Sequence, residues 1–206
     1  ANGKYGDKDG DGYSNYAESM EGTNANSNTS KPTDSDLDGM SDRYETQNGT
    51  SLNDSAGENG KYGDKDGDGY TNAAEYGEGT LAGDAISKPA DTDYDGMSNG
   101  WETANGLNPN SNLGADGAYG DKDGDGFTNL AERNEGTAAN SLADKPQDAD
   151  EDGMSDAYES ANGLSPNDAT GANGKYGDPD GDGITNGSEY RDGSLAGTAD
   201  SKPKDT

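Results

Sequence analysis

Two residue types are absent from this chain of 206 residues, which contains no cysteine and no histidine. Without cysteine it can form neither disulfide bonds nor thiolate metal sites, and without histidine it lacks the usual general base and the usual ligand of transition metals. Hydrophobic residues are also scarce, at 25%, with a single Trp and a single Phe. No apolar run approaches the length of a membrane span, and no signal peptide is visible. The composition argues against a membrane span and against a conventional hydrophobic core.

Acidic residues are what the chain has in excess. There are 43 Asp and Glu against 14 Lys and Arg, which gives a formal net charge of -29. A chain so acidic and so poor in apolar residues is expected to stay disordered unless a ligand neutralises part of its charge. The same charge should repel nucleic acid and anionic membranes, so we expect neither as a partner.

One pattern recurs seven times: Asp-x-Asp-x-Asp-Gly, followed by Glu at the twelfth position. This is the spacing of a calcium loop. Carboxylates come from positions one, three and five, the glycine at position six permits a sharp bend, and position seven offers its backbone carbonyl. Position nine can act through a water, and the Glu can bind through both oxygens, whereas Mg²⁺ demands a stricter octahedral site. We therefore predict at least seven Ca²⁺ ions per chain, with metal binding coupled to folding.

The predicted ligands occupy six positions of each loop. Four acidic residues per loop, with Asp42 and Asp156 at position nine, account for 30 of the 43 acidic residues, and seven Ca²⁺ would bring the charge from -29 to -15. In one type of loop the predicted metal ligands are Asp7, Asp9, Asp11, Tyr13, Asn15, Glu18, Asp64, Asp66, Asp68, Tyr70, Asn72, Glu75, Asp121, Asp123, Asp125, Phe127, Asn129, Glu132, Asp178, Asp180, Asp182, Ile184, Asn186 and Glu189. In the other type they are Asp34, Asp36, Asp38, Met40, Asp42, Glu45, Asp91, Asp93, Asp95, Met97, Asn99, Glu102, Asp148, Asp150, Asp152, Met154, Asp156 and Glu159.

The loops alternate in these two types. Their first residues are separated alternately by 27 and 30 residues, so the period is 57 residues with two loops in each. Type-one loops follow a Tyr-Gly pair, have Tyr, Phe or Ile at position seven, and span 7–18, 64–75, 121–132 and 178–189. Type-two loops follow Lys-Pro, have Met at position seven, and span 34–45, 91–102 and 148–159. Residues 1–206 are interpreted as a single tandem array, truncated within a repeat at both ends.

Each loop is predicted to run into a short helix. Position eight is always Ser or Thr and position nine is Asn or Asp, which suits a helix N-cap, and pairs such as Asn48-Gly49 suit a left-handed C-terminus. Positions nine and twelve also match a capping box, and the two roles can coexist. The segment before each loop is rich in Gly, Asn or Pro and cannot be the entering helix of an EF-hand. The expected fold is a loop-rich tandem repeat with short helices, forming an elongated calcium-stabilised rod without a conventional hydrophobic core.

Other loop positions are interpreted as packing contacts. The alternative for the Met at position seven is a calmodulin-like target groove, but recurrence once per period favours packing against the adjacent repeat. Tyr44, Trp101 and Tyr158 share position eleven of the type-two loop, where small clusters between repeats are favoured over platforms for sugars. The alternative for the acidic loops themselves is a solvated acidic tract, which the fixed Gly, the Glu and the strict phase disfavour.

Two segments resemble a known family. DTDYDGMSNGWETANGLNPN at 91–110 and DKDGDGFTNLAERNEGT at 121–137 are similar to bacterial thrombospondin type 3 repeats, and the loop-then-helix form is also similar to dockerin. The cysteines of animal thrombospondin arrays are absent, and the seven loops exceed the two of a dockerin. The resemblance implies an extracellular or cell-surface, calcium-stabilised array that serves as a stalk, a spacer or an adhesive segment.

The favoured function is an extracellular calcium-binding structural repeat that forms a rigid stalk, spacer or filament segment. Its expected partners are neighbouring repeats of a longer chain or copies of itself in a fibre. The alternatives are an adhesin or dockerin-like module that binds a cell-surface protein or glycan, and a calcium sensor or buffer. Catalysis is the weakest class, because the carboxylates repeat identically as metal ligands would, and we expect no enzyme.

Overall fold

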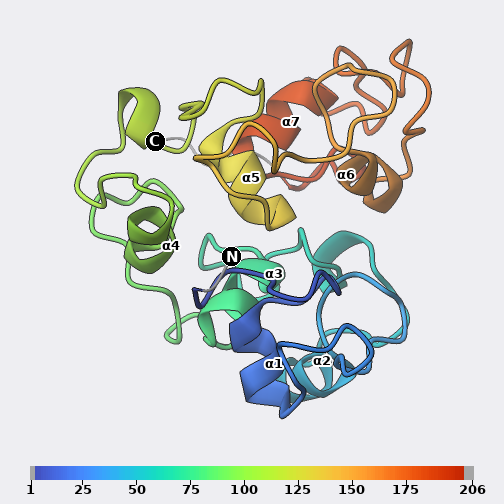
Figure 1. The fold of residues 1–206 in the computed structure, drawn as a ribbon. Coiled ribbons are helices and arrows are strands. Elements are labelled where there is room, and N and C mark those ends of the chain that lie inside the picture. The colour runs from blue at the N-terminus through green and yellow to red at the C-terminus, as the bar shows by residue number, and fades with distance from the viewer. Residues whose placement is uncertain (1–2, 202–206) are drawn as a thin grey trace. The chain divides into compact units, whose positions relative to one another are not determined.

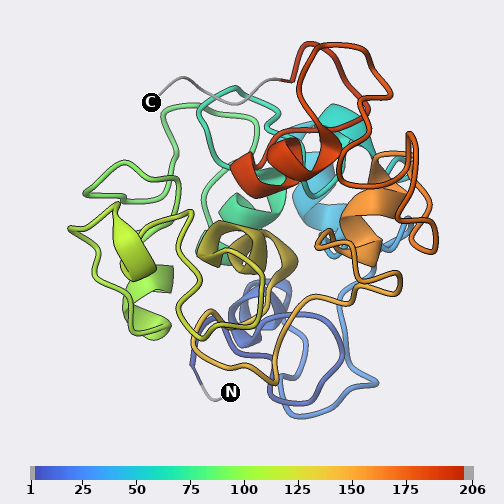
Figure 2. The same ribbon diagram turned by 90° about the horizontal axis from the view of Figure 1, so that it is seen from above.

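The computed structural model describes residues 3–201, and these fall into helices, turns and irregular segments without a β-strand. Long loops separate the short helices in both views of the fold (Figures 1 and 2). The chain divides into two compact units, Ala1–Ala90 and Asp91–Thr206. Three of the predicted loops lie in the first unit and four in the second. The truncation expected at the two ends falls on residues 1–2 and 202–206, which lie outside the described residues.

The expectation of a loop followed by a short helix is confirmed in every repeat. Each α-helix begins at position nine of a loop, so the second half of the loop is the first turn of the helix. The α-helices are α1 (Asn15–Glu21), α2 (Asp42–Asn48), α3 (Asn72–Glu78), α4 (Asn99–Ala104), α5 (Asn129–Glu135), α6 (Asp156–Ala161) and α7 (Asn186–Asp192), with the 3₁₀ turns η1 (Gly57–Asn59) and η2 (Gly114–Asp116) between periods.

Local hydrogen bonds define both ends of these helices. The position-eight hydroxyl accepts a hydrogen bond from the backbone N–H of position eleven in six loops, as in Ser14 with Ala17. The exception is Thr185, whose hydroxyl is 3.0 Å from that of Ser188. Five helices end at a glycine in the left-handed region, and at α1 the N–H of Gly22 donates to the carbonyl of Glu18. Helices of six or seven residues cannot persist alone, so tertiary contacts must hold them.

The tyrosine at position eleven of a type-two loop joins that loop to the next repeat. The hydroxyl of Tyr44 donates to the carbonyl of Thr80 at 3.0 Å and accepts from the N–H of Ala82 at 3.1 Å. Its ring lies 4.8 Å from that of Tyr76, at an interplanar angle of 51°. The corresponding contacts recur in the second unit, where Tyr158 contacts Tyr190, Ser194 and Ala196. The predicted clusters between repeats are therefore present at Tyr44 and Tyr158, while Trp101 at the same position is buried.

Side chains at position seven are buried in six of the loops, and that of Ile184 in the seventh is half-buried. Met40, Met97 and Met154 are fully buried, as expected for packing residues and not for an open target groove. In the first unit one hydrophobic cluster joins α1, α2 and α3, and it consists of Tyr13, Ala17, Met40, Tyr44, Tyr76 and Ala82. Helix α1 also contacts α3, and in the second unit α5 contacts α7, so within each unit the two type-one helices pack together. Packing thus occurs in small clusters between repeats.

Candidate metal centres

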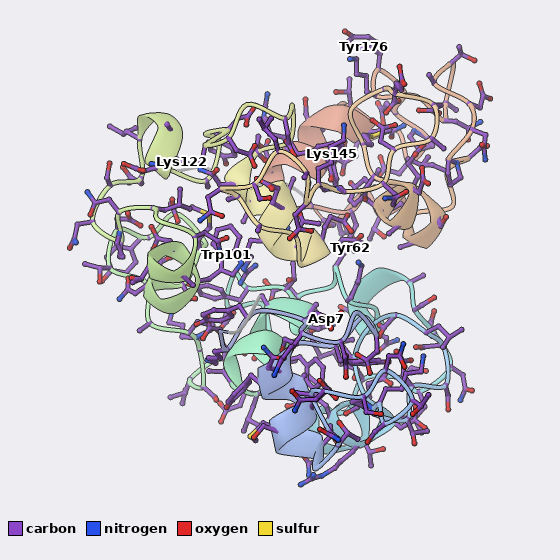
Figure 3. All side chains as sticks on the ribbon, viewed as in Figure 1. Asp7, Tyr62, Trp101, Lys122, Lys145 and Tyr176 are labelled. Atoms are coloured by element: carbon purple, nitrogen blue, oxygen red, sulfur yellow. The ribbon has the colours of Figure 1, made fainter. Side chains whose placement is uncertain are left out.

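The first three aspartates of a loop converge on one point. In five loops the carboxylates of positions one, three and five place one oxygen each within 4.8 Å of one another, and two more acidic groups of this kind occur. Asp7 marks the head of the first such loop in Figure 3. The five groups are Asp7, Asp9 and Asp11; Asp34, Asp36 and Asp38; Asp64, Asp66 and Asp68; Asp91, Asp93 and Asp95; and Asp121, Asp123 and Asp125.

The aspartate at position one shapes the loop. In the first loop, Oδ1 of Asp7 accepts from the N–H of Gly10 at 2.7 Å, and Oδ2 accepts from that of Gly12 at 2.9 Å. All seven loops have this pair of bonds, and in all seven the position-five aspartate accepts from the N–H of position seven. Such short-range bonds favour turns over regular structure. They turn both carboxylates toward the centre of the loop.

Two positions of the loop require left-handed backbone. Position six has φ between 92° and 105° in all seven loops, and it is always glycine, as the sequence predicted. Position four also has positive φ, which the sequence analysis did not recognise. The available signal was the glycine at this position in all four type-one loops, namely Gly10, Gly67, Gly124 and Gly181. The type-two loops place Leu37, Tyr94 and Glu151 there at φ of 61° to 62°, a strain of about 1–2 kcal/mol each.

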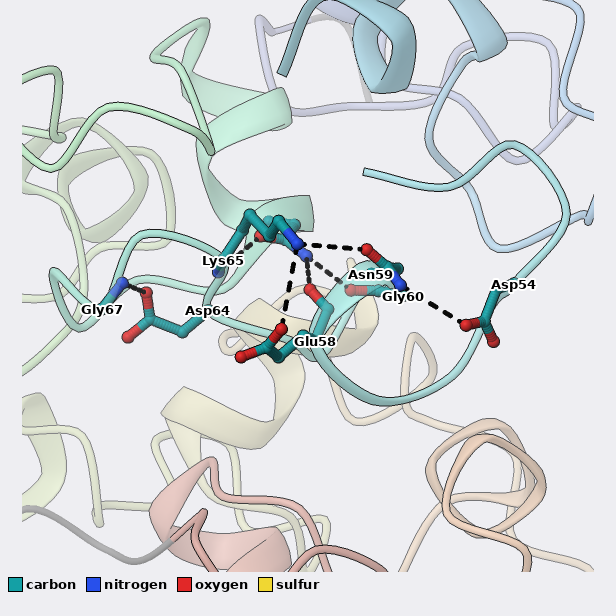
Figure 4. Close-up of polar contacts among 8 residues, drawn as sticks. Asp54, Glu58, Asn59, Gly60, Asp64, Lys65 and Gly67 are labelled. Carbon is teal, nitrogen blue, oxygen red and sulfur yellow. Dashed lines mark hydrogen bonds and ion pairs between the residues drawn. The ribbon is translucent and has the colours of Figure 1, made fainter. Parts of the chain in front are cut away.

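The side chain at position nine fastens the loop to the segment before it. In the loop at 64–75, Oδ1 of Asn72 accepts from the N–H of Lys65 at 3.1 Å, and Nδ2 donates to the carbonyls of Glu58 and Gly60. Figure 4 labels Lys65 of the loop, and Glu58 and Gly60 of the segment before it. Six loops have the bond from the position-two N–H to position nine. In the seventh loop position two is Pro179, which has no N–H, and Oδ1 of the buried Asn186 accepts no hydrogen bond from the described residues. Position nine thus has a clear structural role beside its predicted role as a water-mediated ligand.

The glutamate at position twelve is fully buried in every loop. In four of them both carboxylate oxygens are buried without a hydrogen-bond partner among residues 3–201: Glu45, Glu102, Glu132 and Glu159. Glu18 and Glu75 each have a threonine hydroxyl nearby, from Thr23 and Thr80. A buried carboxylate without a partner costs several kcal/mol unless a cation or a proton neutralises it.

The pKa values of these glutamates show the same imbalance. Burial, followed by repulsion from the aspartates of the same loop, raises the pKa to about 8 in Glu45, Glu75, Glu102, Glu132 and Glu159. Burial likewise raises the pKa of Asp38 to about 7 and that of Asp95 to about 6. A cluster of inward-facing carboxylates with orphaned oxygens fits a hard divalent cation, and Ca²⁺ accepts this mixture of carboxylate, carbonyl and water oxygens. Asp9, whose two buried oxygens accept no hydrogen bond from the described chain, contributes two further oxygens that could bind the cation.

The comparisons with known proteins agree with this chemistry. A family model described as the bacterial TSP3 repeat matches residues 7–27, 64–80, 91–112, 121–137 and 178–194. No curated protein and no solved structure matches the chain. Four of the matched segments begin with type-one loops and one with a type-two loop, and the loops at 34–45 and 148–159 have the same ligand pattern. Within residues 3–201 no helix is long and apolar enough to cross a membrane. Five segments of the chain are therefore bacterial TSP3 repeats, and repeats of this family are calcium-binding structural repeats.

Proposed function

We propose that this chain is an extracellular, calcium-loaded structural array that acts as a rigid stalk, spacer or filament segment. The observation that carries the proposal is the set of buried position-twelve glutamates, whose carboxylate oxygens face aspartates of the same loop. Ordinary domains are held mainly by buried hydrocarbon, whereas each repeat here also buries a cage of oxygens that needs a cation. At least seven Ca²⁺, bound by the predicted ligands of the seven loops, would supply the missing positive charge.

Contacts between repeats support rigidity. Tyr44 and Tyr158 each join a type-two loop to the next type-one repeat by two hydrogen bonds and a ring contact. Each ion would hold its own loop, and the tyrosines would hold successive loops in a fixed relation. Repeats stacked through nearest-neighbour contacts build elongated assemblies, so the proposed shape is a rod. Repeats of this family are typically extracellular, where calcium is abundant enough to load sites of modest affinity.

Small-angle X-ray scattering with circular dichroism tests the proposal. With millimolar Ca²⁺ we expect an elongated, rigid particle with helical signal, and with EGTA an expanded chain without it. Mg²⁺ should not restore the signal, because it demands octahedral geometry. Native mass spectrometry should count at least seven ions per chain. A scattering profile and a spectrum that do not change on calcium removal would refute the proposal, and a compact calcium-loaded particle would refute the rod.

A second candidate, an adhesin or dockerin-like module, draws on exposed side chains that differ between equivalent positions. Leu37 and Tyr94 are 79% and 87% exposed at position four of type-two loops, and the third such loop has Glu151 there. Tyr176 is also exposed and projects from its loop (Figure 3). If these side chains bind a cell-surface protein or glycan, replacing Leu37 and Tyr94 by Ser should abolish capture of that ligand and leave calcium loading intact. Unchanged capture would exclude these two side chains as the binding residues.

A further inference from the structure

Tyr13 belongs to two loops at once. Its backbone lies at position seven of the loop at 7–18, where its N–H donates to Oδ1 of Asp11 at 3.0 Å. Its side chain leaves that loop, and the hydroxyl donates to Oδ2 of Asp34 at 2.7 Å. Asp34 is position one of the next loop. A single buried residue therefore connects the candidate metal centre of one loop to that of the following loop.

The carboxylate that receives this bond is the one that shapes the second loop. Oδ1 of Asp34 accepts from the N–H of Leu37 at 2.7 Å, and Oδ2 accepts from that of Gly39 at 3.0 Å. Asp34 also converges with two other aspartates on the second metal centre. The phenol thus helps to orient a ligand carboxylate, and its own position depends on the order of the first loop.

The rest of the array varies at this position. The residue equivalent to Tyr13 two periods later is Phe127, which is also buried, and its ring lies 6.4 Å from that of Tyr190 in an edge-on contact. Phenylalanine has no hydroxyl to offer to Asp148, whose carboxylate accepts from the N–H groups of Glu151 and Gly153. The connection from a type-one to a type-two loop therefore depends on one oxygen atom.

From a type-two loop to the next type-one loop, the bond to a carboxylate of the metal centre comes from the backbone of the following repeat. In the second unit, Oδ2 of Asp95 accepts from the N–H of Ala118 at 2.8 Å, and Oδ2 of Asp152 accepts from that of Lys175 at 2.7 Å. These donors are backbone groups just ahead of the next type-one loop, so any residue but proline can supply them. The step from type one to type two is the one that a single side chain can switch.

We infer that the Tyr13 hydroxyl couples the first two calcium sites, so that an ion in the loop at 7–18 raises the affinity of the loop at 34–45, and that Phe127 leaves the corresponding pair at 121–132 and 148–159 without this coupling. The inference rests on the proposed calcium loading of the loops. By linkage the effect is reciprocal, so an ion in the loop at 34–45 raises the calcium affinity of the loop at 7–18 by the same factor. One hydrogen bond of about 1 kcal/mol corresponds to about fivefold in affinity.

Calcium titration of the full chain, followed through backbone amide resonances, tests the coupling. The amide of Gly39 reports on the second site because it donates to Asp34. In the natural sequence, disabling the first site with Glu18→Gln should raise about fivefold the calcium concentration at the midpoint of the Gly39 titration. In a chain that carries Tyr13→Phe, the same substitution should leave that midpoint unchanged. Tyr94→Phe, an exposed tyrosine, is the matched control and should preserve the fivefold effect.

The third period provides a gain-of-coupling variant that does not remove any contact. In the natural chain, Glu132→Gln should leave the calcium midpoint at Gly153 unchanged, and in a Phe127→Tyr background it should raise that midpoint about fivefold. Equal shifts at Gly39 in the natural and Tyr13→Phe backgrounds, or no gain from Phe127→Tyr, would overturn the inference while calcium loading stands. An absence of any calcium response at Gly12 and Gly39 would overturn the proposed loading itself.

Discussion

The free energy of unfolding should rise with calcium concentration at a rate that counts the loops. An ion bound only by the folded chain adds about 1.4 kcal/mol per tenfold increase in its concentration above the dissociation constant. Five aspartate triplets and two more acidic groups equal the seven loops in number. The expected total is about 10 kcal/mol per tenfold increase, summed over all unfolding transitions. Even at calcium concentrations of one to ten times the dissociation constant, seven sites add about 3–10 kcal/mol, which approaches the whole stability of an ordinary domain.

Urea unfolding followed by circular dichroism, at a series of buffered calcium concentrations and constant ionic strength, measures this slope. If the two units unfold separately, three loops in residues 1–90 should give about 4 kcal/mol per tenfold increase and four loops in 91–206 about 5.5. Glu102→Gln should reduce the total by about 1.4 kcal/mol, because its buried carboxylate is a predicted ligand. The matched control is Glu151→Gln, which changes the same charge at an exposed side chain and should leave the slope unaltered.

The outcome that refutes this reasoning is a total slope below about 1.4 kcal/mol per tenfold increase, which corresponds to fewer than one ion released on unfolding. A slope that is large but equal for Mg²⁺ and Ca²⁺ would refute the assignment of the metal and not the count.

Three further outcomes are expected. Burial raises the pKa of the position-twelve glutamates from 4.5 to about 8 in the metal-free fold, so that fold should be most stable below pH 4.5 and lose stability as the pH rises toward 8. Calcium affinity should rise over the same range, because the ion binds the ionised carboxylate. Urea unfolding of the metal-free chain measures the first trend, and calcium titrations at each pH measure the second. Tyr44→Phe should cost about 2 kcal/mol in saturating calcium, measured by urea unfolding, because it removes two buried hydrogen bonds, whereas Tyr94→Phe should cost nothing measurable. Gly39→Ala, at φ of 97°, should lower stability by about 1–2 kcal/mol in thermal unfolding, and Gly77→Ala inside α3, with open space around it, should raise it by up to about 1 kcal/mol.

The sequence was sufficient for the loops because their structure is local. The bonds that shape a loop join residues at most five positions apart, as in Asp7 with Gly10 and Gly12, so a fixed spacing of Asp and Gly specifies the turn. The starts of six helices could be predicted for the same reason, since the hydroxyl that caps each of them lies three residues before the N–H that donates to it.

The contacts between repeats could not be obtained in this way. Tyr44 meets backbone groups 36 and 38 residues further along the chain, and only the folded arrangement brings them together. The same limit applies to the bond from Tyr13 to Asp34, for which the sequence offered only a tyrosine at a packing position. The structural use of Asn72 was hidden for a different reason: a side chain at a ligand position can also bond to backbone, and spacing alone does not distinguish these uses.

The buried carboxylates have a consequence for what happens when the chain opens. Unfolding of an ordinary domain exposes hydrocarbon, which gives a large increase in heat capacity and a surface prone to aggregation. Opening these repeats releases ions and exposes charged groups such as Glu45 and Glu159 that water solvates readily and that repel one another. The heat-capacity increment per residue should therefore be small, the stability curve flat over a wide range of temperature, and the opened chain soluble enough to refold when calcium returns.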